Sequence, residues 1–84
     1  MSGIEQALMA VMAARGGDAL AARDHISAAQ QQTATAPRRE RQVVEIAALV
    51  VAGRRERAAG LALEHIAEFP ADSELLAGVA PTDE

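Results

Sequence analysis

Histidine is the side chain of this sequence best suited to proton transfer, and the chain has two, His25 and His65. His25 has an acidic neighbour, Asp24, and a hydroxyl two positions later, Ser27. On a helix, residues one or two positions apart point in different directions, so neither an Asp–His dyad nor a Ser–His pair arises locally. We therefore interpret His25 as a solvated histidine on a helix surface.

His65 and Glu68 are three residues apart, a spacing that places both side chains on one helix face. Such a pair could begin a metal or proton-transfer site, but two ligands do not hold a metal ion. The other histidine belongs to a different predicted hairpin, and the chain has no cysteine. We therefore predict no metal site and expect His65 to lie at the edge of the core, hydrogen-bonded to a carboxylate.

Two arginine clusters, at residues 38–41 and 54–57, are the positive groups that could bind phosphate. They flank one predicted helix of roughly 14 residues, which separates them by about 20 Å. The formal net charge is −4 and Phe69 is the single aromatic residue. Attraction to a phosphate backbone and stacking on bases are therefore both weak, and we predict no binding of nucleic acid.

Gly16 and Gly17 could hold an anion at the start of a helix, but Asp18 places a carboxylate where that anion would lie. We interpret the two glycines as a turn. Ser73 follows an aspartate, as the modified serine of acyl carrier proteins does, but too little chain follows it to supply the helices of such a carrier. From these residues we predict no catalytic residue, no cofactor and no metal, and we expect the protein not to be an enzyme.

The elements that position these side chains are predicted to be helices, because about a quarter of the 84 residues are alanine, the best intrinsic helix former. A chain of this length forms one small domain. Its longest apolar run, residues 46–52, is far shorter than the roughly 20 residues that span a bilayer. No basic cluster precedes the first apolar residues, as it would in a secretory signal. We expect a cytoplasmic protein that does not enter a membrane.

Glycine, proline and capping residues mark where the predicted helices begin and end. Ser2 and Glu5 form a capping box, while Pro37, Gly53 and Pro70 interrupt the chain later. The helix between Pro37 and Gly53 is apolar nearly all round, so we expect it to be central. The predicted fold is all-α. A single domain over residues 1–80 holds two stacked antiparallel hairpins, at 3–32 and 38–69, and a short C-terminal capping helix at 72–79. A disordered tail follows at 81–84.

The two predicted hairpins are copies of one degenerate repeat. Gly17 and Gly53 are 36 residues apart, close to the roughly 34-residue period of helix–turn–helix repeats. The positions five, nine and twelve residues after each glycine correspond between the two copies. They hold Ala22, Ile26 and Ala29 in the first copy, and Ala58, Ala62 and His65 in the second. The residues that we assign to the structural turn and closure of the repeat are Gly17, Gly53, Ala58 and Pro70.

This pattern resembles the tetratricopeptide repeat (TPR), in which a Gly-Asp-type turn joins two antiparallel helices and small residues let them approach closely. The second helix of each hairpin carries the match. In the preceding helix of the second copy, Gln42, Glu45 and Ile46 stand where the family has aromatic, leucine and glycine residues, and His65 replaces an alanine. The resemblance implies a TPR-like α–α superhelix that binds proteins, and the departures argue against a standard peptide-binding groove.

A longer stretch is similar to the family of tetratricopeptide repeat protein 38. The similarity is carried by Arg-Glu-Arg-Gln-Val-Val at residues 39–44, the Ala-Gly-Arg turn at 52–54, Ala58, and Glu-Phe-Pro-Ala-Asp at 68–72. Members of that family are several times longer. The resemblance therefore implies one stretch of a larger solenoid, or a compact relative.

We expect the chain to be a non-catalytic scaffold that binds a protein partner. The alternative is a structural segment of a longer solenoid protein, an enzyme or a regulator, without activity of its own. The central helix carries more aliphatic side chains than its alanine-rich neighbours can cover, so its uncovered strip should bind the partner or pair with its own copy in a two-fold dimer. The residues of this predicted partner surface are Val43, Val44, Leu49, Val50 and Val51.

Overall fold

The computed structural model describes residues 2–79, and all the regular structure within that range is helical. The prediction of an all-α protein is confirmed. The predicted disordered tail at 81–84 and the predicted domain end at residue 80 lie outside the described residues. The elements are α1 (Gly3–Arg15), α2 (Ala19–Gln32), α3 (Arg38–Val51), α4 (Arg55–Glu68), the 3₁₀ helix η1 (Pro70–Asp72) and α5 (Ser73–Val79).

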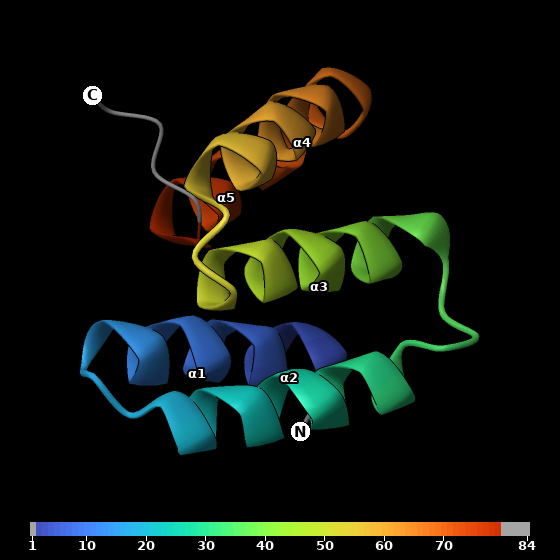
Figure 1. The fold of residues 1–84 in the computed structure, drawn as a ribbon. Helices are drawn as coiled ribbons and strands as arrows, with labels where there is room; N and C mark the ends of the chain where they lie inside the picture. The colour runs from blue at the N-terminus through green and yellow to red at the C-terminus, as the bar shows by residue number, and fades with distance from the viewer. Residues whose placement is uncertain (1, 80–84) are drawn as a thin grey trace.

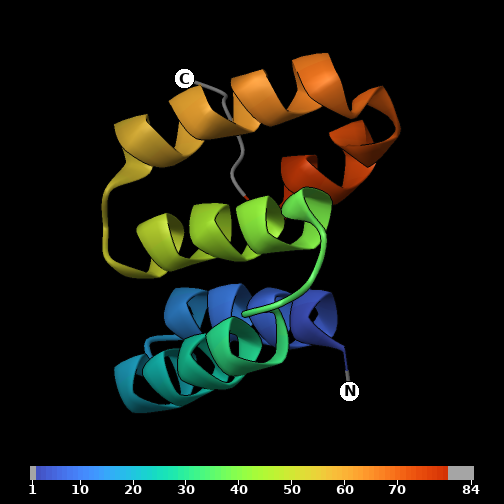
Figure 2. The same ribbon diagram turned by 90° about the vertical axis from the view of Figure 1, so that its right-hand side faces the viewer.

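α3 is the central helix of the molecule, as its apolar circumference predicts. α1 and α2 form an antiparallel hairpin, and α3 packs on both of them (Figure 1). α4 packs on the other side of α3, and the turn through η1 brings α5 back against α3 beneath α4 (Figure 2). α3 thus contacts every other α-helix, and these contacts cover the apolar side chains that dominate its C-terminal half.

The helix ends follow the local signals of the sequence. The Ser2 hydroxyl accepts the Glu5 backbone N–H at 3.1 Å, and the Glu5 carboxylate accepts the Ser2 backbone N–H at 2.9 Å, which completes the capping box. Asp18 caps α2 by accepting the Ala21 N–H at 3.0 Å. Gly17 and Gly53 have φ angles of 84° and 79°, in the left-handed region where residues with a side chain are strained.

The 36-residue spacing of the two glycines extends to the helices themselves. α4 begins and ends 36 residues after α2, at 55 against 19 and at 68 against 32. The same spacing relates Ala7 of α1, Val43 of α3 and Val79 of α5, which are all completely buried. By this register α5 corresponds to the first two turns of α3.

The core is built largely from alanine, with a few larger aliphatic side chains between the helices. Small residues let the helix axes come close but remove little apolar area from water, so each contributes less than a buried leucine would. Among the described residues, none of the helices is long and apolar enough to cross a membrane. The largest side chains that are almost completely buried are Ile46, Leu76, His65, Val11, Val43 and Val79.

Candidate functional site

A buried polar cluster joins α3, α4 and η1, and His65 of α4 lies at its centre. The His65 side chain is completely buried, at 0% exposure. Its Nδ1 lies 2.6 Å from Gln42 Oε1 on α3, and its Nε2 lies 2.7 Å from Asp72 Oδ2 on η1. The Phe69 ring covers the imidazole, with the two ring centroids 4.8 Å apart. Both ring nitrogens are therefore engaged inside the protein.

Arg39 closes this cluster from the surface. Its Nε donates to Asp72 Oδ2 at 2.8 Å and its Nη2 donates to Asp72 Oδ1 at 2.7 Å, the bidentate geometry that suits a guanidinium and a carboxylate. The Asp72 side chain is 4% exposed and the Arg39 side chain 41%. The hydrogen bond from Arg39, and after it that from His65, hold the pKa of Asp72 below its ordinary value, although burial opposes this shift. We call Arg39, Gln42, His65 and Asp72 the polar clasp.

The polar clasp fastens the C-terminal segment to the second hairpin. Asp72 lies in the turn before α5, and its two partners belong to α3 and α4. The Gln42 amide faces Nδ1 and the Asp72 carboxylate faces Nε2, so each ring nitrogen of His65 has a hydrogen-bond partner. Because the imidazole is completely buried and both nitrogens are occupied, we assign the clasp a structural role.

His65 is completely buried and does not lie at the edge of the core as expected, and the structure identifies the carboxylate that it binds. His65 is hydrogen-bonded to a carboxylate as expected, but the carboxylate is Asp72 and not Glu68, which instead pairs with Arg38 at 3.1 Å on the surface. Asp72 is hydrogen-bonded to both Arg39 and His65. Within the first arginine cluster, Arg39 thus holds a buried carboxylate, whereas Arg38 forms its ion pair on the surface.

His25 also differs from the solvated histidine that its neighbours suggest. It is half-buried, and its Nδ1 lies 2.7 Å from Gln6 Oε1 on α1. Gln6 and Gln42 are 36 residues apart, each eleven positions before the turn glycine of its hairpin. In each hairpin this glutamine contacts a histidine of the following helix. The repeat of the glutamine is the feature of the sequence that could have predicted both contacts. Neither contact follows from spacing within one helix.

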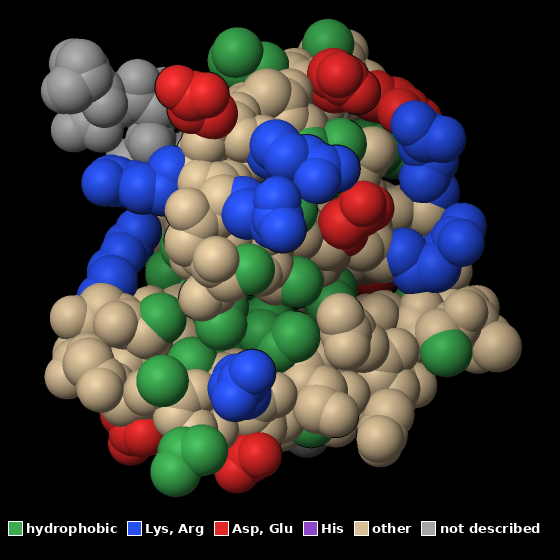
Figure 3. Space-filling view, in the orientation of Figure 1, with side chains coloured by type: hydrophobic (Ala, Val, Ile, Leu, Met, Phe, Trp, Pro, Cys, Tyr) green, Lys and Arg blue, Asp and Glu red, His purple; other side chains and the backbone are tan. Residues whose placement is uncertain are grey.

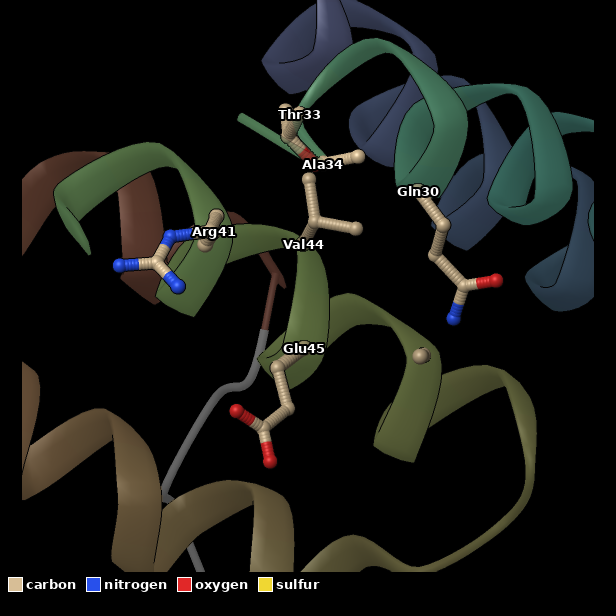
Figure 4. A pocket seen from close by; sticks show the side chains of 7 residues that line it. Gln30, Thr33, Ala34, Arg41, Val44 and Glu45 are labelled. Atoms are coloured by element: carbon tan, nitrogen blue, oxygen red, sulfur yellow. The ribbon is translucent and has the colours of Figure 1, made fainter. Parts of the chain in front are cut away.

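A shallow cleft with a mainly apolar lining lies between α2 and α3. Its volume is about 230 Å³. Val44 and Ala48 of α3 and Ala34 after α2 form its floor, while Arg41, Glu45 and Gln30 form its rim (Figure 4). In the orientation of Figure 1, hydrophobic side chains gather at the level where α3 meets the first hairpin (Figure 3). The complete lining is Gln30, Thr33, Ala34, Arg41, Val44, Glu45 and Ala48.

The predicted partner surface on α3 is only partly accessible. Val43 is completely buried in the hydrophobic core, so it cannot contact a partner in this fold. Val44 is 2% exposed and reaches the surface only at the floor of the cleft. Leu49, Val50 and Val51 are half-buried and keep some surface for a partner.

The second arginine cluster surrounds the start of α4. Arg54, Arg55 and Arg57 line a second open depression of about 380 Å³ together with Gly53 and Glu56. Arg54 occupies the capping position, but its side chain makes no capping hydrogen bond to the backbone. All three arginines are exposed.

Comparison of the chain with protein-family models, with curated proteins and with solved structures finds no match. The similarity to the tetratricopeptide repeat, and to the family of tetratricopeptide repeat protein 38, therefore stays a prediction from the sequence.

Proposed function

We propose that this chain is a non-catalytic protein-interaction module with TPR-like hairpins, and that a partner protein binds in the cleft between α2 and α3. The observation that carries the proposal is the cleft itself, whose apolar floor is framed by exposed charged and amide side chains. An apolar centre with a polar rim is the usual anatomy of a protein interface. The hairpins 36 residues apart, with glycine turns of positive φ, support the TPR-like assignment.

The chemistry of the lining favours binding over catalysis. Thr33 has the only hydroxyl of the cleft, and it donates to the Ala29 carbonyl at 2.8 Å. The remaining polar groups are one guanidinium, one carboxylate and one amide, without a histidine to relay a proton. The volume of about 230 Å³ is below the roughly 300–1,000 Å³ of small-molecule pockets, so a side chain of a partner is a better occupant than a substrate.

A second candidate is a structural segment of a longer solenoid without activity of its own. It is supported by α5, which corresponds to the first two turns of α3 and so begins a third repeat unit. In a solenoid, each unit covers the apolar face of its neighbour. A further 36-residue unit in the flanking reading frame would support this candidate, and a frame without one would count against it.

Selection from a random-peptide display library tests the interaction module. Ala48→Arg should fill the floor of the cleft, and Ala67→Arg, at an exposed position of α4 outside the lining, is the matched control. We expect enriched peptides to bind the wild type and Ala67→Arg alike and to lose affinity for Ala48→Arg by about tenfold or more, because a desolvated anchor at an interface centre is worth at least about 1.4 kcal/mol. Circular dichroism verifies that both variants fold. Peptides that bind Ala48→Arg equally well, or no enrichment at all, would contradict the proposal.

A further inference from the structure

The rim of the α2–α3 cleft carries two opposite charges one helical turn apart. Arg41 and Glu45 are both exposed on α3, and a separation of four residues along a helix is about 6 Å. The ion pairs among residues 2–79 engage Arg38 and Arg39 of the same cluster, and neither Arg41 nor Glu45 takes part in them. Both charges are thus available to a partner.

We propose that the occupant of this cleft is an amphipathic helix of a partner protein, and that charge order fixes its direction. An aliphatic side chain of that helix enters the apolar floor at Val44 and Ala48. An acidic residue of the helix lies beside Arg41, and a basic residue one turn later lies beside Glu45. This inference rests on the proposed function, because it names the kind of partner that the same cleft binds.

A helix fits the rim better than an extended strand does. Residues i and i+4 of a partner helix are about 6 Å apart along its axis, which matches the spacing of Arg41 and Glu45, and residue i+3 projects from the same face into the cleft. In a strand, residues i and i+2 have a similar spacing of about 6.6 Å, but residue i+1 between them points to the opposite face. A strand that satisfied both charges would therefore turn its aliphatic side chain away from the floor.

The volume and the opposite side of the cleft agree with this occupant. About 230 Å³ holds one aliphatic side chain rather than a chain of aromatic anchors. Gln30, across the cleft on α2, offers an amide that can donate to or accept from a polar flank of either sign (Figure 4). Charge order on α3 is then the feature that distinguishes one direction of the helix from the other.

Three helical peptides test the proposal directly. The first carries Glu, Leu and Lys at positions i, i+3 and i+4; the second exchanges Glu and Lys; the third replaces Leu by Ser. Their dissociation constants are measured by fluorescence anisotropy against the wild type and against the double variant Arg41→Glu with Glu45→Arg. The two substituted side chains are exposed, so the variant should keep its helical circular dichroism.

The wild type should prefer the first peptide over the second by about tenfold at low ionic strength. The second peptide satisfies both charges only by binding in the opposite direction, which displaces its Leu from the floor by two residues, or about 3 Å. The double variant should reverse this preference. The preference should shrink in about 1 M salt, whose Debye length is about 3 Å. The Ser peptide should bind neither protein. If Leu-dependent binding is blocked by Ala48→Arg but shows no charge order, the directed helix is refuted while the interaction module stands. If no helical peptide binds, the inference also fails. The peptide-library selection then tests independently whether the chain is an interaction module.

Discussion

Asp72→Ala is the substitution for which the structure gives the largest expected loss of stability. It removes the carboxylate that Arg39 and His65 share, and it leaves His65 Nε2 without its partner in a completely buried position. Breaking a buried charged pair from one side costs about 3–5 kcal/mol. Because the Arg39 side chain is 41% exposed and regains water, we expect about 2–3 kcal/mol. For a domain of this size that loss lowers Tm by roughly 10–20 °C.

Thermal and urea unfolding followed by far-UV circular dichroism at neutral pH measure this loss. Glu68→Ala is the matched control, since Glu68 is also in an ion pair but its side chain is 45% exposed, and we expect it to cost less than about 0.5 kcal/mol. A double-mutant cycle with Arg39→Ala should show a coupling of at least about 1 kcal/mol. Equal losses for the Asp72 and Glu68 variants would refute the view that burial makes the polar clasp important.

Three further predictions concern pH, the turns and self-association. The folded pKa of Asp72 lies below its unfolded value of about 3.9. The free energy of unfolding of the wild type should therefore exceed that of Asp72→Asn by its full amount above about pH 5, and the difference should shrink as the pH falls through the folded pKa. Urea unfolding across this range measures the difference, and a difference that does not change with pH would show that the pairing is unimportant. Gly53→Ala should destabilise the protein by about 1–2 kcal/mol, because Gly53 has a positive φ. Gly60→Ala, on an open helix face, should stabilise the protein by about 0.5–1 kcal/mol. Effects of the same sign at both sites would contradict the left-handed conformation of Gly53 in the turn. Sedimentation equilibrium should detect a dimer that Val51→Glu weakens without loss of helical circular dichroism, and a wild-type monomer would show that α3 is covered within one chain.

The sequence predicts the helices closely because their ends are encoded by neighbouring residues. The capping box at Ser2 and Glu5, the glycine turns and Pro70 act over three or four positions, and α5 spans Ser73–Val79, within one residue of the predicted capping helix. Such signals do not need the rest of the chain. The 36-residue spacing likewise predicts which helices correspond to each other.

The polar clasp and the accessible surface of α3 depend on the tertiary structure. Arg39 and Asp72 are 33 residues apart, and Glu68, on the same helix as His65, is the carboxylate nearer to it along the chain. Only the turn of the chain through η1 brings Asp72 to the buried imidazole. In the same way, the sequence shows that Val43 is apolar, but only the packing of the other helices around α3 decides that it is completely buried. Helix ends are set by local hydrogen bonds and backbone angles, whereas the partner of a buried side chain is set by which helix faces meet, and those contacts form only when the whole chain packs.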